Sequence, residues 1–449
     1  MATTYLHRTP SVGGDRDKWT FATWIKRSKT DTNESILGAF SDGSNHTQFF
    51  WRGDNLEFTQ KDGGVVTALL QTTRVFRDPT AWYHLVCVWD SGNAEAGDRM
   101  RIYVNGVEET VFNSDTNPSL NLDSFLNSTS YANEIGAAVS TEYFSGAMAH
   151  THFCDGQAYA ASDFGEFDST SGIWVAKTSP SVTYGTNGFF LKYQDTAAFG
   201  DDSSGNTNDF TLSGTMTQTK DTPDNNFCTI NALDNYYPDY TFSNGNNKIT
   251  THAGNENYTT STVWLGAGRW YWEVLVDTSS GNGPDVGYID KVTSGTSNYL
   301  GQASGAAWRW DGNLRVNNSY ASGTFATYTS GDYLGFYLDL EDNKIYVAKN
   351  GTIQNSGTGI AITAAASVVS GTGLYTPAFG DEHSTSSTYS ANFGNGSFGS
   401  TQLTGTTYSD DDSNGTFKYS PNDGGASSFD GSAKNFYAIC TNNLATYGG

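Results

Sequence analysis

The sequence has few cysteines, and they are widely separated. Cys87, Cys154, Cys228 and Cys440 form no C-x-x-C pair. This spacing excludes the common zinc and dithiol motifs and predicts no disulfide framework. Cys87 lies in an apolar stretch, so we expect it to be a small core residue.

Long apolar runs and basic residues are also scarce. No stretch of 18 apolar residues occurs, and residues 1–14 lack the apolar core of a signal peptide. The chain carries 47 acidic against 24 basic residues, for a formal net charge of −23 at pH 7. Such a surface repels phosphate backbones and anionic lipids. We therefore expect no nucleic acid partner and no membrane insertion.

Segments with helical periodicity are few, and short alternating runs between turn residues dominate instead. The chain contains 50 glycines and is 14% aromatic, and that aromatic content argues against disorder. Short strands separated by turn residues are the pattern of an all-β protein. At 449 residues the chain is long enough for two or three domains, each with its own core.

Residues 82–109 and 331–354 share one layout. Each has a long alternating strand, a turn, and a second strand that ends in Asn-Gly, at Asn105-Gly106 and at Asn350-Gly351. Asn-Gly tolerates the positive φ of a tight hairpin, so we expect a strand-to-strand turn at both places. Residues 82–90 are apolar on both faces and should be buried on both sides. The parallel predicts two tandem antiparallel β-sandwiches.

Motifs along the chain resemble two known families. W-T-F-x-x-W-I-K-R-S, W-Y-H-L-V, R-I-Y-V-N-G and Y-F-S-G-x-M-A resemble a laminin-G-like (concanavalin A-like) domain, particularly in tail and virion proteins of marine-type tailed bacteriophages. Those proteins often open with L-x-R-T-P-S, as residues 6–11 do. Further on, W-Y-W-E, G-D-Y-L-G-F-Y-L-D and K-N-G resemble the SPRY family, a bent β-sandwich that binds partners through its loops.

These resemblances divide the chain into four parts. Residues 1–155 are the expected laminin-G-like sandwich, and residues 156–232 a connector that packs on it. Residues 233–395 are the expected SPRY-like sandwich, and residues 396–449 a polar C-terminal tail. The two sandwiches should therefore divide near residue 232.

One acidic loop is a candidate calcium site. Its sequence, D-x-S-G-N-x-N-D, resembles a loop of laminin-G-like domains that often holds Ca²⁺, which implies Asp202, Asn206, Asn208 and Asp209 as ligands. The alternative is a loop packed on itself through Asx-turns, in which the same side chains bond the backbone. The sequence leaves both open.

A second candidate is a ligand site at Trp308, Arg309, Trp310 and Asp311. An exposed aromatic ring beside polar side chains can stack on a sugar. The alternative is that these tryptophans pack between strands. Six other tryptophans lie in alternating strand runs and are expected in the cores: Trp19, Trp24, Trp82, Trp89, Trp270 and Trp272.

Catalytic motifs are missing. Glucanases that share this sandwich use paired carboxylates on a strand, but no E-x-D-x-x-E occurs. Glu166-Phe167-Asp168 lacks the third acid, and Glu273 and Asp277 are expected to be ordinary strand-edge acids. No G-x-S-x-G elbow occurs either. The sequence therefore predicts no catalytic residue and no enzyme.

The resemblances imply a non-enzymatic bacteriophage virion protein, assembled in the host cytoplasm and released by lysis. A tail fibre or receptor-binding adhesion protein that recognises a host surface glycan or protein is the expected role. Other virion proteins and further copies of the chain are the expected partners. The alternatives are a capsid decoration or connector protein and a glycan depolymerase.

Overall fold

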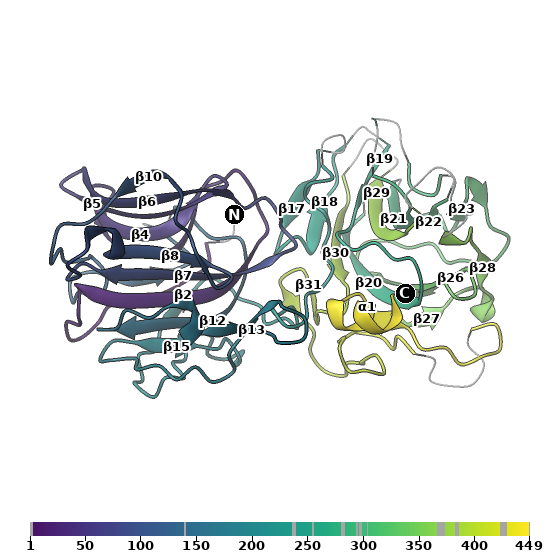
Figure 1. The fold of residues 1–449 in the computed structure, drawn as a ribbon. Helices are drawn as coiled ribbons and strands as arrows, with labels where there is room; N and C mark the ends of the chain where they lie inside the picture. The colour runs from purple at the N-terminus through teal and green to yellow at the C-terminus, as the bar shows by residue number, and fades with distance from the viewer. Residues whose placement is uncertain are drawn as a thin grey trace. The chain divides into compact units, whose positions relative to one another are not determined.

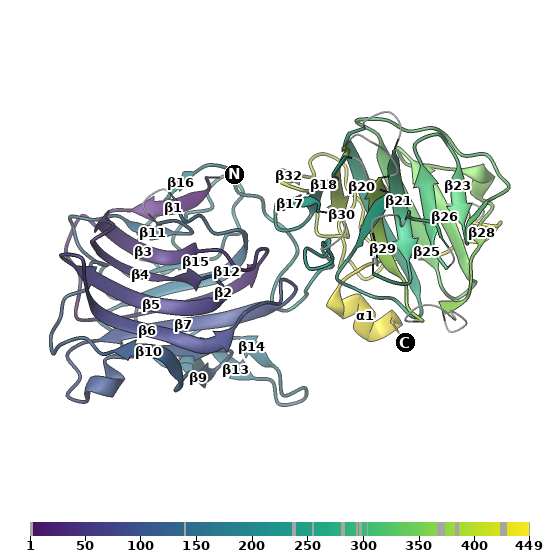
Figure 2. The same ribbon diagram turned by 90° about the horizontal axis from the view of Figure 1, so that it is seen from above.

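The structure is a computed structural model. It describes residues 3–138, 141–235, 239–253, 256–279, 283–292, 295, 299–302, 304–365, 373–381, 386–422 and 429–448. The chain forms two compact units, Met1–Gln218 and Thr219–Gly449. Both are built from β-sheets (Figures 1 and 2). Within the described residues, no helix is long and apolar enough to cross a membrane.

The first unit is a sandwich of two antiparallel sheets. Among the described residues, sheet A has eight strands in the order β10-β6-β5-β4-β3-β11-β1-β16, and sheet B has six in the order β15-β12-β2-β7-β8-β9. The strands of sheet A are β1 (Tyr5–Arg8), β3 (Glu34–Asp42), β4 (Asn45–Arg52), β5 (Asn55–Asp62), β6 (Val65–Val75), β10 (Phe112–Thr116), β11 (Asn133–Ile135) and β16 (Thr211–Ser213). Those of sheet B are β2 (Lys18–Arg27), β7 (Trp82–Asp90), β8 (Met100–Val104), β9 (Val107–Glu108), β12 (Gly146–Asp155) and β15 (Phe189–Leu191).

Strand β7 is buried on both faces, as the sequence predicts. Leu85 and Trp89 pack in the core between sheets A and B. Val86 and Val88 point to the other side of sheet B, where a second apolar cluster includes Trp174. Alternate residues of a strand face opposite ways, so an apolar run needs a cover on each side.

That outer cover comes from the segment after β12. It contains the 3₁₀ turn η2 (Ala161–Asp163) and a short hairpin of β13 (Gly165–Phe167) and β14 (Trp174–Ala176). Another 3₁₀ turn, η1 (Ala96–Asp98), lies between β7 and β8. The indole N–H of Trp174 donates to Nδ1 of buried His84 at 3.1 Å. Strands β15 and β16 join sheets B and A, so the expected connector packs on the first sandwich as far as Gln218.

The second unit is also a two-sheet sandwich. In its described part, sheet C has nine strands along β17-β18-β30-β20-β25-β26-β27 with β28 and β33 at its side, and sheet D has six in the order β19-β29-β21-β22-β23-β24. The strands of sheet C are β17 (Thr241–Ser243), β18 (Lys248–Thr250), β20 (Arg269–Thr278), β25 (Tyr333–Asp339), β26 (Lys344–Lys349), β27 (Thr352–Ile353), β28 (Ile360–Ala361), β30 (Thr388–Asn392) and β33 (Tyr437–Ala438). Those of sheet D are β19 (Asn257–Thr260), β21 (Pro284–Ile289), β22 (Ala306–Arg309), β23 (Leu314–Val316), β24 (Ser319–Tyr320) and β29 (Thr376–Asp381).

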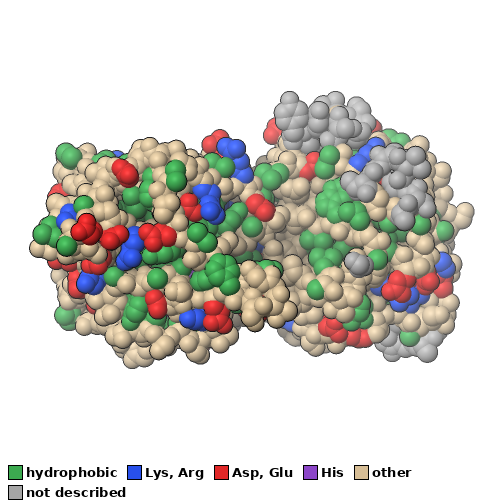
Figure 3. Space-filling view, in the orientation of Figure 1, with side chains coloured by type: hydrophobic (Ala, Val, Ile, Leu, Met, Phe, Trp, Pro, Cys, Tyr) green, Lys and Arg blue, Asp and Glu red, His purple; other side chains and the backbone are tan. Residues whose placement is uncertain are grey.

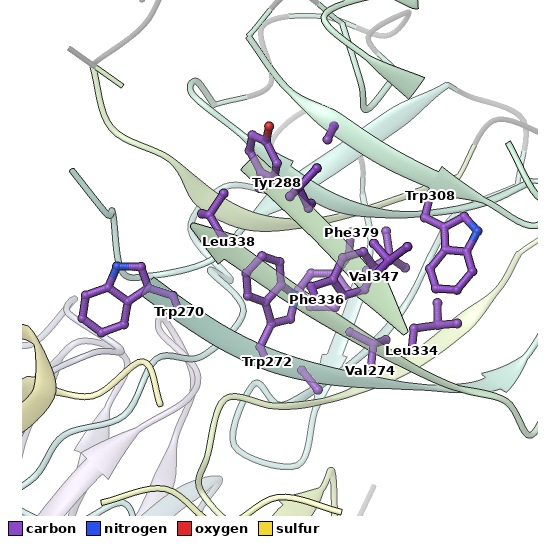
Figure 4. Packing of buried hydrophobic residues seen from close by; sticks show 14 of the residues in the cluster. Trp270, Trp272, Val274, Tyr288, Trp308, Leu334, Phe336, Leu338, Val347 and Phe379 are labelled. Atoms are coloured by element: carbon purple, nitrogen blue, oxygen red, sulfur yellow. The ribbon is translucent and has the colours of Figure 1, made fainter. Parts of the chain in front are cut away.

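The core of the second unit lies between sheets C and D. Trp272 stacks on Phe336 with ring centroids 5.2 Å apart, and Trp308 meets Phe336 edge-on from sheet D (Figure 4). The six tryptophans predicted as core residues are all buried. The described elements include a single α-helix, α1 (Thr441–Tyr447), beside η3 (Asn355–Gly357) and the small hairpin of β31 (Ser397–Phe398) and β32 (Thr401–Gln402). The all-β prediction is confirmed.

Two predicted boundaries differ from the structure. The units divide after Gln218 rather than near residue 232, because Cys228 and Ile230 pack in the core of the second unit. The described part of residues 396–449 is no separate tail: Phe417, Phe429 and Phe436 are buried against Tyr271 and Tyr337 on the outer face of sheet C. This C-terminal cover gives sheet C its second apolar layer.

Both predicted Asn-Gly hairpins are confirmed. Asn105 and Gly106 have φ of 48° and 81° between the paired residues Val104 and Val107. Asn350 and Gly351 have φ of 49° and 79° between Lys349 and Thr352. Positive φ at both central residues defines the type I′ turn, whose twist matches that of the strands.

Gly106 allows a direct test, because a Cβ there would lie 2.3 Å from the Trp174 ring. We expect Gly106→Ala to lower the free energy of unfolding of the first unit by about 1–2 kcal/mol for positive φ and about 1–3 kcal/mol more for overpacking. Gly63→Ala is the matched control, since Gly63 is also a hairpin glycine with positive φ but has nothing within 4 Å of its Cβ. Equal losses in chemical denaturation would contradict the role of Trp174.

Candidate functional site

The outer face of sheet A carries a continuous row of side chains across all eight strands. In register, the row consists of Thr211, His7, Glu134, Gly38, Gln48, Thr59, Leu69 and Thr116. Their neighbours along the strands, such as Phe49 and Phe58, point into the core. Strand alternation therefore turns this row, here called the central row, away from the core.

The centre of this face is polar and tightly hydrogen bonded. Gln48 and Glu57 are each only 4% exposed although they lie on the outer side of the sheet. Nε2 of Gln48 donates to Oε2 of Glu142 at 2.8 Å. Glu57 accepts from Nε of Arg52 at 2.6 Å and from Nε2 of Gln71 at 3.0 Å. The centre is thus a preorganised floor of amides and carboxylates.

Aromatic rings flank the floor on the β1 side. Tyr5 lies 5.5 Å from His7 and 6.1 Å from Tyr143, measured between ring centroids, and all three are partly exposed. Phe40 stacks on His46 at 5.1 Å beside Gly38. Partly exposed rings beside amides and carboxylates suit sugars, which offer both apolar faces and hydroxyl groups.

Sequence reasoning missed this face. The available signal was the alternation in β4 and β5, where Gln48, Glu57 and Thr59 interrupt aromatic core residues. Single-strand alternation does not show which polar residues meet across strands. The register of β1, β11 and β16 depends on pairings between distant segments, so the central row emerges only from the fold.

Two carboxyl groups with strongly raised pKa lie elsewhere, in buried positions. Burial raises the pKa of Glu34 to about 7; the side chain is 2% exposed and lies 3.8 Å from Arg27. Burial likewise raises the pKa of Glu273 to about 7. Oε2 of Glu273 accepts from the N–H of Lys418, and Oε1 from that of Tyr419. Glu273 is therefore no strand-edge acid but an anchor for the C-terminal cover.

The tryptophan candidate is corrected by the structure. Trp308 is wholly buried in the core and offers no face to a ligand, and Trp310 packs partly buried against the same core. Arg309 points to the opposite side of β22, where it pairs with Asp285 at 3.6 Å and lies 4.0 Å from Asp311. Alternation along β22 separates the ring from the cation.

The candidate calcium loop is closed by its own hydrogen bonds. Asp202 accepts from the N–H groups of Phe190, Ser204 and Asn208 at 2.8–2.9 Å and from Oγ of Ser204 at 2.8 Å. Asp209 accepts from the N–H of Asp202 at 2.9 Å.

The two asparagines of the loop bond the backbone in the opposite direction, as donors. The amide nitrogens of Asn206 and Asn208 donate to carbonyl groups of residues 185–188, and Arg8 donates to Oδ1 of Asn208. Asp202 forms an Asx-turn with the N–H of Ser204, and the asparagines attach the loop to residues 185–188, so the loop is packed as the self-bonded alternative describes.

We expect Asp202→Ala to lower the free energy of unfolding of the first unit by about 2–3 kcal/mol, because four donors lose a charged acceptor. The loss should be equal in calcium and in EDTA. Asp201→Ala, at the exposed neighbour, should change it by less than about 0.5 kcal/mol. Melting curves in both buffers measure this, and a calcium-dependent shift that Asp202→Ala removes would restore the metal site.

Comparisons with known proteins match each sandwich to a protein family. Residues 3–160 match the family described as concanavalin A-like lectin/glucanases superfamily, and residues 269–396 match the SPRY domain family. The chain carries a concanavalin A-like/laminin G domain followed by a SPRY domain. The two domains suggest a binding function. No curated protein matches the chain.

Three of the solved structures with similarity to the chain are SPRY domains. The SPRY domain of human HERC1 is 20% identical, with a TM-score of 0.29, over 34% of this chain and 91% of that one. A human SPRY domain is 16% identical, with a TM-score of 0.24, over 32% of this chain and 90% of that one. The TRIM65 PSpry domain is 13% identical, with a TM-score of 0.28, over 37% of this chain and 91% of that one.

Proposed function

We propose that this protein is a non-enzymatic adhesion protein whose laminin-G-like domain binds a glycan on the outer face of sheet A. The observation that supports it best is the polar floor around the central row, formed by Gln48 in the row and Glu57 beside it, with partly exposed rings at Tyr5 and Tyr143 nearby. Floors of this kind orient sugar hydroxyl groups, while rings supply stacking area.

The proposal extends to a bacteriophage virion, with the chain in a tail fibre or receptor-binding position. Its support is the sequence resemblance alone, in the opening L-x-R-T-P-S and the order of the strand motifs. Other virion proteins, copies of the chain and a host surface glycan or protein are the partners that follow. A capsid decoration role is the alternative within the same setting.

Depolymerase activity is the second candidate, and the hydrogen bonding of this face argues against it. A glycosidase needs one carboxyl that donates a proton and a second that acts as nucleophile or base, across an open groove. Glu57 is 4% exposed and bound by Arg52, and Glu142 is held by Gln48. Both groups are occupied as structural acceptors.

The test uses the full chain and polysaccharide extracted from host cells. We expect binding without new reducing ends, and a roughly tenfold weaker affinity for Tyr5→Ala, which removes stacking area. Tyr408→Ala, at an exposed tyrosine of the second unit, is the control and should bind normally. Sustained release of reducing ends would overturn the non-enzymatic proposal, and unchanged binding by Tyr5→Ala would overturn the assigned face.

A further inference from the structure

The outer edge of sheet D holds a cluster of two arginines and two tyrosines. The guanidinium of Arg315 lies 4.4 Å from the ring centroid of Tyr299 and 5.3 Å from that of Tyr320. The guanidinium of Arg309 lies 5.9 Å from the Tyr320 ring. On the face shown in Figure 3, the few basic side chains (blue) mostly lie beside acidic ones (red). Here two of the chain's 24 basic residues meet at one ring.

The hydroxyl oxygen of Tyr320 accepts a hydrogen bond from each of the two arginines. Nη1 of Arg309 donates to the hydroxyl of Tyr320 at 2.6 Å, and Nη2 of Arg315 donates to the same oxygen at 3.2 Å. Tyr320 is 57% exposed and lies on the edge strand β24. An oxygen held by two guanidinium forks marks the position that a carboxylate oxygen of a ligand would take.

The cluster is held rigidly by the turn before β24. Asn317 and Asn318 have φ of 50° and 62°, and their N–H groups donate to the carbonyls of Gly305 and Gly301. The hydroxyl of Tyr299 donates to Oδ1 of Asn318 at 2.7 Å. A fixed turn lowers the conformational entropy that binding would otherwise cost.

We propose that this cluster is a binding site for a carboxylate-bearing glycan. The guanidinium groups of Arg315 and Arg309 would bind the carboxylate in place of the Tyr320 hydroxyl. The Tyr320 ring would pack against the sugar, and the exposed amides of Asn317 and Asn318 would meet its hydroxyl groups. A glycan fits better than an acidic peptide, because the cluster combines an exposed ring and two exposed amides with only two guanidinium groups.

This site lies in the second unit and is independent of the face proposed on sheet A. Asp285 and Asp311 lie beside Arg309, and the rings of Tyr299 and Tyr320 lie beside Arg315. Arg315 is the better residue to replace, because its guanidinium contacts both rings of the cluster. Its replacement leaves Tyr5 and the central row untouched.

The experiment titrates the full chain with oligogalacturonate in a calorimeter. We expect binding that the methyl-esterified oligomer lacks, that Arg315→Gln weakens about tenfold or more, and that Arg315→Lys weakens in part, because a lysine lacks the planar fork. Arg77→Gln, which removes a 68% exposed cation of the first unit, is the charge control and should bind normally.

Tyr320→Phe keeps the ring and removes the competing acceptor. We expect this variant to bind oligogalacturonate as tightly as the parent or more tightly, whereas Tyr320→Ala should bind several-fold more weakly. Thermal melting confirms that each variant is folded. Failure of oligogalacturonate to bind, equal binding by Arg315→Gln, or preference for a hexaglutamate peptide would each overturn the proposal.

Discussion

Glu273→Gln is expected to destabilise the second unit by about 2–4 kcal/mol. The carboxylate is fully buried and accepts four hydrogen bonds, from the N–H groups of Lys418 and Tyr419, from Nδ2 of Asn392 and from the hydroxyl of Tyr271. A glutamine in its place turns one of the two oxygens into a donor that faces other donors. The C-terminal cover then loses its attachment to β20.

The matched control is Glu341→Gln, at a 53% exposed acid that pairs with Arg269 at 2.7 Å. Exposed pairs contribute little, so this change should cost about 1 kcal/mol or less. Chemical denaturation with hydrogen exchange of β20 as the readout separates the two variants. Equal stability of Glu273→Gln and the parent would show that the cover is held by its aromatic residues alone.

The same group predicts a pH dependence of the second unit. Burial raises the pKa of Glu273 from 4.5 to about 7, although its four donors favour the charged form. A carboxyl with a raised pKa in the folded state stabilises the fold below pH 4.5, and this contribution is lost as the pH rises to 7. Glu273→Gln should lack this part of the dependence.

Strands can be predicted from the sequence where the side chains on each of their two faces show a clear pattern. In β7, Leu85 and Val86 are both apolar, and the structure covers each from a different side. In β25, Phe336 faces the core, and Tyr337 faces the C-terminal cover. Alternation and Asn-Gly turns are local signals, and they sufficed for the sandwiches and the hairpins.

The C-terminal cover was missed because its apolar residues are sparse. Phe417, Phe429 and Phe436 are separated by long polar stretches, so no strand or helix period links them. The available signal was in the sheet that the cover packs on. Tyr271 and Tyr337 are large rings on the side of sheet C that faces away from the core. Aromatic residues on an outer face require a covering segment.

The candidate sites depend on contacts that no local pattern encodes. Trp308 and Arg309 are adjacent in sequence but lie on opposite faces of β22, so a site containing both was impossible in a strand. The site proposed here joins Arg309 to Arg315 and Tyr320, which the pairing of three consecutive strands brings together. Their meeting depends on the hairpin register.

The buried His84 should make the first unit sensitive to acid. It is buried between Trp24 and Trp174, with ring centroids at 5.0 and 5.9 Å, and its Nδ1 accepts the indole N–H of Trp174. Burial lowers the pKa of His84 from 6.5 to about 3, and burial also lowers that of His152. Both rings are therefore neutral in the folded protein at neutral pH.

A base with a lowered pKa in the folded state stabilises the fold above its unfolded pKa of about 6.5, and this contribution falls as the pH drops toward 3. His84 should cost the first unit about 1.4 kcal/mol per pH unit between its unfolded pKa of 6.5 and its folded pKa of about 3, and His152 acts in the same direction. Glu34 acts in the opposite direction, because burial raises its pKa to about 7 and its contribution grows as the pH falls from 7 to 4.5. The contributions of His84 and Glu34 therefore oppose each other between pH 6.5 and 4.5, and His152 acts in the same direction as His84.

His84→Asn tests this argument, because the asparagine oxygen can accept the Trp174 N–H without titrating. The variant should be less stable than the parent at pH 7.5, since it packs less well between the two indoles. Between pH 6.5 and 5 its stability should fall less steeply, by about 1.4 kcal/mol per pH unit. Hydrogen exchange of β7 amides in the full chain measures both slopes, and parallel slopes would contradict a neutral, buried His84.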